Sequence, residues 1–248
     1  MELTVLGASG THPTPEHACS GYLLRHEGYT AWVDAGNGTL ARLQEHVAMG
    51  DVDAIWLSHA HPDHCADLYP FFYALLMDPG GASVPVYTPH GVREKLAHLI
   101  GEDSVERFNT RLAWRPLQPG ESVEAGPFTF EAFEAAHSTA NNSLRASTAG
   151  RVLCYSGDTG PNEHLAAAAE DADLFLCEAS WVESDAGLMA PIHLRASEAG
   201  RVASQAGAKR LALTHIWPRN DLGEVKEQAG DAYGGHVEIA REARGFEI

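Results

Sequence analysis

The chain has 248 residues, of which 44% are hydrophobic, and its formal net charge is −17 at pH 7. That length suits one domain with a sizeable core, so we expect residues 1–248 to form a single domain. Such an acidic surface repels phosphate backbones and anionic membranes, which argues against a long nucleic acid or a membrane as partner.

Neither a membrane span nor a secretory signal is expected. No window reaches the roughly 18 consecutive apolar residues of a membrane span. The N-terminus begins as a strand-like run, without a basic region followed by an apolar one, so we expect a cytoplasmic protein. The cysteines are far apart and form no Cys-x-x-Cys pair, so we expect Cys19, Cys65, Cys154 and Cys177 to be reduced.

Strand-like and helical segments alternate along the whole chain. In the first half, strands are predicted at residues 2–7, 20–25, 30–33, 53–58 and 84–87, and helices at residues 40–48, 63–76 and 92–100. In the second half, two antiparallel strands are predicted within 111–135, a hairpin at 142–148 and 151–155, strands at 174–177 and 210–214, and a helix at 197–206. The repeated pattern predicts an α/β fold of two packed sheets with helices outside, the four-layer αββα arrangement.

The stretch from His59 to His64 places four metal-capable side chains, His59, His61, Asp63 and His64, within one short loop. Imidazole nitrogens and carboxylate oxygens in a tight cluster are donors that suit Zn²⁺. One loop cannot wrap all four around a single ion comfortably, so two ions about 3.5–4 Å apart make better sense. Asp63 could alternatively cap the next helix rather than bind metal.

Three further candidate ligands each follow an apolar run. His137 follows residues 130–136, Asp158 follows residues 152–155, and His215 follows residues 211–214. Separate strands can deliver such side chains to one edge of a sheet sandwich. Structural zinc is usually four-coordinate and rich in cysteine, so seven His and Asp ligands favour a catalytic site.

The ordered set His59-x-His61-x-Asp63-His64, His137, Gly157-Asp158-Thr159 and Thr214-His215 resembles the motifs of the metallo-β-lactamase superfamily. The stretch from His193 to Arg219 resembles the tail of its ribonuclease Z and phosphodiesterase branch. The resemblance implies the αββα sandwich of that superfamily. It also implies that one ion is held by His59, His61 and His137, that the other is held by Asp63, His64 and His215, and that Asp158 bridges them.

The same resemblance implies catalytic roles for Asp63, His193, Glu178 and Arg219. In that branch, the equivalent of His193 contacts the scissile phosphate and protonates the leaving oxygen, the equivalent of Glu178 orients it, and the equivalent of Arg219 grips phosphate. Plainer interpretations stay open: His193 as the start of a helix, Glu178 as a carboxylate at a sheet end, and Arg219 as an ordinary loop residue.

Three departures from the family pattern narrow the range of substrates that we expect. Asp67 stands where many relatives have Gly, and Leu194-Arg195 stands where ribonuclease Z usually has Ser-Thr. Residues 138–157, between His137 and Asp158, leave no room for the long tRNA-gripping arm of ribonuclease Z. We therefore expect a small phosphodiester, such as a cyclic nucleotide.

The sequence thus predicts a metal-dependent hydrolase, a phosphodiesterase with two Zn²⁺, although Mn²⁺ or Fe²⁺ would accept the same ligands. One alternative is a hydrolase of esters, aryl sulfates or lactones. Another is an inactive metal-binding or sensor protein, which would require a missing ligand or an occluded pocket. The expected partner is a small-molecule substrate, and relatives commonly pair as homodimers.

Overall fold

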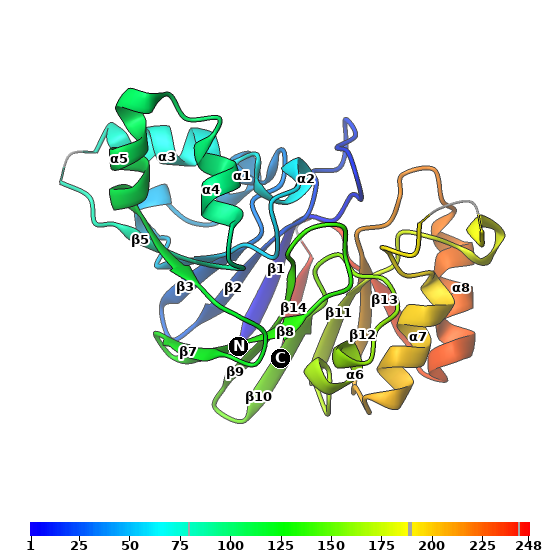
Figure 1. Cartoon of the computed structure of the whole chain (residues 1–248). Helices are drawn as coiled ribbons and strands as arrows, with labels where there is room; N and C mark the ends of the chain where they lie inside the picture. The colour runs from blue at the N-terminus through cyan, green and yellow to red at the C-terminus, as the bar shows by residue number, and fades with distance from the viewer. Residues whose placement is uncertain (79, 188–189, 243) are drawn as a thin grey trace.

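The computed structural model describes residues 1–78, 80–187, 190–242 and 244–248. Within these ranges the chain forms two seven-stranded sheets, with helices α3, α4 and α5 outside one and α6, α7 and α8 outside the other (Figure 1). This is the αββα arrangement that the alternating pattern predicts.

The first sheet has the strand order β14–β1–β2–β3–β4–β5–β6. Its strands are β1 (Glu2–Gly7), β2 (Gly21–His26), β3 (Tyr29–Val33), β4 (Ala54–Trp56), β5 (Val84–Thr88), β6 (Leu112–Pro116) and β14 (Gly245–Glu247). The strands from β1 to β3 are antiparallel, and those from β3 to β6 are parallel. The connecting helices are α1 (Thr39–Leu43), η1 (Met49–Asp51), α2 (Pro62–Cys65), α3 (Leu68–Leu76), α4 (Val92–Ala97) and α5 (Glu102–Arg111).

The second sheet repeats this plan, with the order β13–β12–β11–β10–β9–β8–β7. Its strands are β7 (Ser122–Ala125), β8 (Phe128–Glu134), β9 (Asn142–Thr148), β10 (Arg151–Tyr155), β11 (Leu174–Glu178), β12 (Leu211–Thr214) and β13 (Val237–Ile239). Strands β7 to β10 are antiparallel, and β10 to β13 are parallel. The helices here are α6 (His164–Ala168), η2 (Glu183–Asp185), α7 (Ala196–Gln205) and α8 (Leu222–Tyr233).

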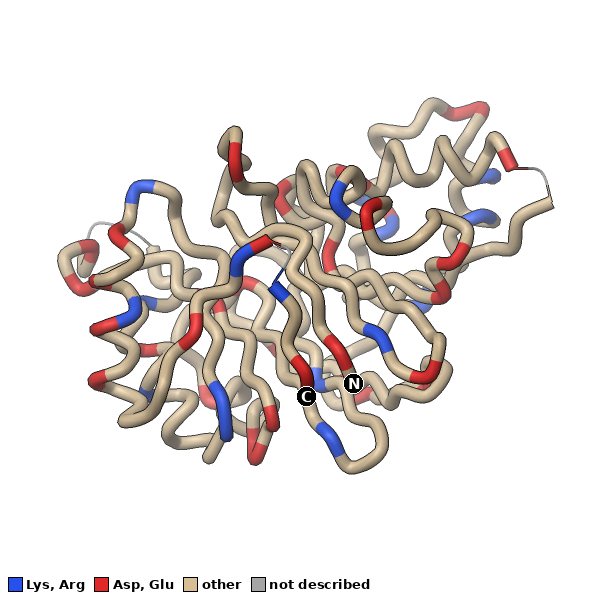
Figure 2. Tube along the Cα trace, turned by 180° about the vertical axis from the view of Figure 1, so that it is seen from behind, with Lys and Arg blue, Asp and Glu red and all other residues tan. Residues whose placement is uncertain are grey.

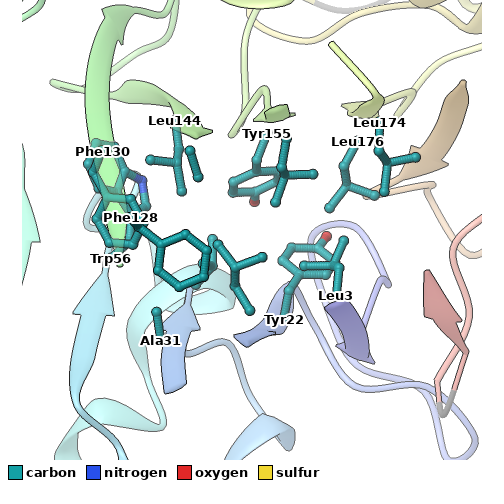
Figure 3. Packing of buried hydrophobic residues seen from close by; sticks show 14 of the residues in the cluster. Leu3, Tyr22, Ala31, Trp56, Phe128, Phe130, Leu144, Tyr155, Leu174 and Leu176 are labelled. Carbon is teal, nitrogen blue, oxygen red and sulfur yellow. The ribbon is translucent and has the colours of Figure 1, made fainter. Parts of the chain in front are cut away.

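The core lies between the two sheets. Figure 3 shows Leu3 and Tyr22 of the first sheet opposite Tyr155 and Leu176 of the second, and all four are buried. Burying each such side chain contributes about 1.5–3 kcal/mol. Tyr22 also carries a hydroxyl, which lies 2.5 Å from Thr214 Oγ1. This hydrogen bond ties the two sheets together at the end of β12, next to His215.

The prediction of two antiparallel strands within 111–135 is confirmed by β7 and β8, but it missed a third strand, β6. Strand β6 is the parallel edge of the first sheet, whereas β7 and β8 form a hairpin in the second. Pro116, Pro119 and Gly120 interrupt the run, and Gly120 has φ 87°. The chain therefore crosses between the sheets in a stretch whose alternation looks continuous.

Two long helices had no sequence prediction. Helix α5 buries only Phe108, and α8 buries only Val225 and Ala229. Few apolar residues therefore mark the core-facing side of either helix. The predicted helix 40–48 is also shorter, because α1 ends at Leu43.

Two expectations about chemistry and environment can be compared with the structure. All four cysteines are free and buried, as expected. No helix in the described part of the chain is both long enough and apolar enough to cross a bilayer.

The two ends of the chain lie together, because Ile248 N donates to Met1 O at 2.9 Å.

Candidate metal centre

The loop after β4 carries the first four candidate ligands. His61 is the N-cap of α2 and has the extended conformation (φ −74°, ψ 145°) that a following proline favours. Pro62 begins the helix, so Asp63 and His64 lie in its first turn. Asp63 does not cap α2. Its Oδ2 accepts a hydrogen bond from Thr11 N at 3.1 Å and lies 3.2 Å from His215 Nε2.

The other three candidates follow β8, β10 and β12, as the sequence predicts. His137 lies beyond β8, Asp158 follows β10, and His215 follows β12 directly. His215 has φ 49°, a conformation that costs a non-glycine residue free energy and is often found at functional sites. Gly10 lies against it: a Cβ on Gly10 would come within 2.6 Å of His215 O. This close approach explains why position 10 is a glycine.

One group of candidate ligands consists of His59, His61, His137 and Asp158. His61 Nδ1 lies 3.0 Å from the Nε2 atoms of both His59 and His137. Asp158 Oδ2 faces the same group, at 3.7 Å from His59 Nε2 and 4.0 Å from His137 Nε2. Three imidazole nitrogens and one carboxylate oxygen therefore converge on one point.

The second group consists of Asp63, His64, Asp158 and His215. Asp158 Oδ1 lies 3.1 Å from His64 Nε2 and 3.4 Å from His215 Nε2. Asp63 Oδ2 lies 3.7 Å from His64 Nε2. Asp158 thus presents one oxygen to each group, which is the geometry of a bridging carboxylate.

Two atoms of the second group indicate that the cluster suits a cation. Among the described residues, His64 Nε2 and Asp158 Oδ1 are buried and make no hydrogen bond. Leaving such groups unpaired costs about 1–3 kcal/mol each, unless an ion or water occupies the space between them. The donor set of histidine nitrogens and aspartate oxygens suits Zn²⁺ and similar ions. These residues could therefore hold divalent metal.

The protonation states of the first group suit metal binding. Burial lowers the pKa of His59 well below its usual value, and it also lowers the pKa of His61 and of His137. These imidazoles are therefore neutral near pH 7 and can offer a lone pair to a metal.

The second group is charged. Burial opposes ionisation of Asp63, but the charges of His64 and His215 outweigh it and lower the pKa of Asp63 to about 2. Burial likewise lowers the pKa of His64, but Asp158, Asp63 and Asp34 together raise it well above its usual value. A metal ion bound at His64 would displace that proton.

Asp34 is a site residue that sequence analysis missed. It follows β3 with φ 57°, is fully buried, and accepts a hydrogen bond from His64 Nδ1 at 2.7 Å. It also accepts from Ser58 N and Ser58 Oγ, each at 2.7 Å, and from Tyr155 Oη at 2.8 Å. Ser58 Oγ in turn lies 3.0 Å from His59 Nδ1. A signal was available, because Asp34 follows an apolar strand just as Asp158 does.

His193 and Glu178 lie beside the ligand cluster. Glu178, at the end of β11, is fully buried, and its Oε1 lies 2.9 Å from His193 Nδ1. His193 Nδ1 is 3.9 Å from Asp158 Oδ2. Burial lowers the pKa of His193, but the charge of Glu178 and the hydrogen bond to it outweigh burial and raise the pKa to about 9. The imidazole is therefore protonated at neutral pH.

Arg219 lies outside the cluster of candidate ligands. Its Nη2 donates to Asp185 Oδ1 at 2.5 Å, and its guanidinium stacks 3.8 Å above the ring of Trp217. The side chain of Arg219 is 53% exposed. Within the described residues it makes no hydrogen bond to a candidate metal ligand, so the structure places it outside the cluster that contains His193.

The comparisons agree with this fold and site. The model of the β-lactamase superfamily domain matches residues 30–216, and the chain belongs to this family. The chain is therefore a protein of the metallo-hydrolase type, with the superfamily's αββα sandwich and with candidate metal-binding residues at one edge of its sheets.

Particular relatives extend over nearly the whole chain. The probable metallo-hydrolase YhfI of Bacillus subtilis is 29% identical, with 97% of each chain covered, and its crystal structure matches with a TM-score of 0.90 over 99% of each chain. An uncharacterized protein of Mycobacterium leprae is 36% identical, with 100% of this chain and 89% of the relative covered. Ribonuclease Z of Halobacterium salinarum is 27% identical, with 98% and 97% covered.

Proposed function

We propose that the chain is a dinuclear-metal phosphodiesterase that acts on a small phosphodiester, such as a cyclic nucleotide. The observation that carries the proposal is the position of the His193–Glu178 pair beside two ligand groups that share Asp158. Cleavage of a phosphodiester needs activated water on one side of the phosphorus and a proton for the leaving oxygen on the other. This arrangement of residues offers a place for both.

We assign the ligands in two sets. One ion would be held by His59, His61 and His137, the other by Asp63, His64 and His215, and both by Asp158. Two Zn²⁺ are the proposed ions, and Mn²⁺ or Fe²⁺ would accept the same donors. When bound, such ions lower the pKa of water to about 7 and offset charge on the phosphoryl oxygens.

His193 is the proposed proton donor. Its Nδ1 is held by Glu178 Oε1 at 2.9 Å, which leaves Nε2 to face the substrate. With a pKa of about 9, the imidazole carries at pH 7 the proton that the leaving alkoxide needs. Glu178 orients the ring and stabilises its positive charge. Aryl sulfates release a phenolate, which is a weak base and needs little help from a proton donor, so this pair favours a substrate that releases an alkoxide, such as a cyclic nucleotide.

Arg219 is proposed to bind phosphate from the rim. A guanidinium has five N–H donors, and the ion pair with Asp185 uses only one side of it. Stacking on Trp217, which lies two residues after His215, limits the positions of the side chain. A guanidinium held in this way is suited to bidentate contact with a phosphate oxygen pair.

The proposed substrate is small because the chain offers little to hold a long polyanion. Figure 2 shows Asp and Glu along both halves of the chain, with Lys and Arg interspersed among them. The net charge of −17 opposes approach of tRNA. Only residues 138–157 separate His137 from Asp158. We accordingly propose a single cytoplasmic catalytic domain without a tRNA-gripping arm, and a homodimer as its assembly.

The test is turnover of a cyclic nucleotide by the metal-loaded protein, because its leaving alkoxide, unlike p-nitrophenolate, needs a proton. His193→Ala should lower kcat/KM by about 10²–10⁴-fold, and Arg219→Ala by about tenfold or more. Arg151→Ala is the matched control, because Arg151 is 57% exposed and pairs with a buried aspartate, Asp173, as Arg219 does with Asp185. Unchanged turnover in both site variants would refute the phosphate assignment.

A substrate panel separates the proposal from its alternatives. Cyclic nucleotides, linear dinucleotides, aryl sulfates and lactones are compared with Zn²⁺ or Mn²⁺ added. The proposal expects the highest kcat/KM for a phosphodiester. A preference for a sulfate ester or a lactone would assign the site to that chemistry instead.

A further inference from the structure

Ser180 lies at a junction of hydrogen bonds between Glu178 and the candidate ligand His215. Its Oγ is 2.7 Å from Glu178 Oε2 and 2.8 Å from His215 Nδ1. Its side chain is buried, with 2% of the residue exposed. Nothing in the motif pattern of the sequence points to this serine.

The directions of these hydrogen bonds follow from the chemistry of the groups. A hydroxyl has one hydrogen to donate, and an ionised carboxylate can only accept. Ser180 Oγ is also 3.0 Å from His215 O, but the carboxylate is the stronger acceptor. Ser180 therefore donates to Glu178 and accepts the Nδ1 hydrogen of His215.

This arrangement fixes the tautomer of His215. With the hydrogen on Nδ1, the lone pair is on Nε2, the atom that lies 3.2 Å from Asp63 Oδ2 and 3.4 Å from Asp158 Oδ1. A histidine that binds metal through one nitrogen needs a partner for the other, because that partner holds the ring and the tautomer. Ser180 is that partner for His215.

Glu178 divides its two oxygens between two histidines. Oε1 accepts from His193 Nδ1 at 2.9 Å and from Thr159 N at 2.7 Å. Oε2 accepts from Ser180, whose hydroxyl continues to His215. One buried carboxylate is therefore connected directly to the proposed proton donor and, through one hydroxyl, to a candidate metal ligand.

We propose that Ser180 is a positioning residue through which Glu178 also orients His215. The proposal rests on the proposed function only in requiring that His215 binds an ion, and it requires no particular substrate. Removal of the hydroxyl should weaken binding of the ion held by Asp63, His64 and His215. The other ion should be unaffected, because the outer partners of His59 and His137 are Ser58 Oγ and Ile192 O.

The test measures the two Zn²⁺ affinities by competition with a chromophoric chelator. Ser180→Ala should lower the affinity for one of the two ions by about 10–100-fold and leave the affinity for the other within threefold of wild type. Ser180→Thr keeps the hydroxyl and should restore the affinity. Ser143→Ala is the matched control, because Ser143 is fully buried and its Oγ donates a single hydrogen bond, to Ser156 O at 2.6 Å.

Activity at saturating Zn²⁺ gives the second readout. Ser180→Ala should regain most of its kcat as Zn²⁺ is raised, because the His193–Glu178 hydrogen bond is intact. Glu178→Gln should not regain it. If Ser180→Ala does not fold, Ser180→Val replaces it with the same expected loss, because valine has the shape of the Ser180→Thr variant without the hydroxyl.

The outcomes separate the two proposals. Zn²⁺ affinities in Ser180→Ala within threefold of wild type, or lowered equally in Ser143→Ala, would overturn the role of Ser180. Wild-type protein that binds two ions but hydrolyses no phosphodiester would overturn the proposed function, while the affinity comparison would still decide the role of Ser180.

Discussion

Asp34 accepts the hydrogen bond of His64 Nδ1 at 2.7 Å, and neither side chain is exposed to solvent. The same carboxylate receives two hydrogen bonds from Ser58, which precedes His59. One buried aspartate on the first sheet therefore orients a candidate ligand in each of the two groups, directly for His64 and through a hydroxyl for His59. Glu178 on the second sheet likewise serves two histidines. It accepts a hydrogen bond from His193 directly and is connected to His215 through the hydroxyl of Ser180.

Asp34→Asn should lower the affinity for Zn²⁺ by about 10–100-fold, because His64 loses the carboxylate that fixes its tautomer. Chelator competition measures this loss. Asp53→Asn is the control, since Asp53 also accepts a backbone hydrogen bond, from Thr30 N at 2.8 Å, but makes no hydrogen bond or ion pair with a histidine among the described residues. Equal affinities in wild type and Asp34→Asn would contradict the role given to Asp34.

Asp67→Gly should destabilise the fold by about 1 kcal/mol. Asp67 Oδ2 accepts a hydrogen bond from Leu40 N at 2.8 Å, in the first turn of α1. Asp67→Asn keeps an acceptor and should cost less. Urea unfolding gives both values. The idea fails if Asp67→Gly is as stable as wild type.

Removal of metal should lower the melting temperature, because the buried His and Asp cluster then lacks its counter-ion. Zn²⁺ at a hundred times its Kd should add about 2.7 kcal/mol of stability. The gain should shrink below about pH 6, since protonated histidines no longer bind metal. Thermal melts with Zn²⁺ and with EDTA measure the difference, and identical melts would argue against an integral metal site.

Asp173 gives a pH-dependent contribution to stability far from the metal centre. Burial raises the pKa of Asp173, but hydrogen bonds from Lys209, Val152 N and Arg151 outweigh burial and lower it. A carboxylate with a lowered pKa in the folded state stabilises the protein above its unfolded pKa of about 3.9, and this contribution is lost as the pH falls through the lower folded value.

Asp173→Asn should therefore cost about 1 kcal/mol at pH 7, given that both cationic partners are largely exposed. The cost should vanish in acid, at pH values below the folded pKa. Glu170→Gln is the control, because Glu170 is exposed and its side chain accepts no hydrogen bond in the described structure. Unfolding free energies at several pH values test this, and a cost that is constant with pH would contradict it.

The sequence predicted most of the residues of the candidate site, because a ligand at a strand end appears in the sequence as a metal-capable residue after an apolar run. His137, Asp158 and His215 each follow an apolar run, and the structure brings all three to the His59–His64 loop. Asp34 follows the apolar strand β3 in the same way, but no further metal-capable residue beside it marks it as part of a site. No such pattern marks Ser180, since its role depends on the register of β11 with β12, where Glu178 pairs with Thr214.

The fold class was predictable for the same reason, since alternation and apolar runs are local. The missed elements depend on tertiary contacts. Helix α8 packs against α7, where a Cβ on Gly200 would come within 2.3 Å of Ala229 O. Strand β14 pairs with β1 at the opposite end of the sequence. Neither contact has a signature in its own segment.

Anomalous diffraction at the zinc edge, from crystals grown with Zn²⁺, tests directly whether two ions share Asp158. We expect two peaks, one on each side of the Asp158 carboxylate, with His59, His61 and His137 around one and Asp63, His64 and His215 around the other. A single peak, or peaks away from Asp158, would contradict this expectation.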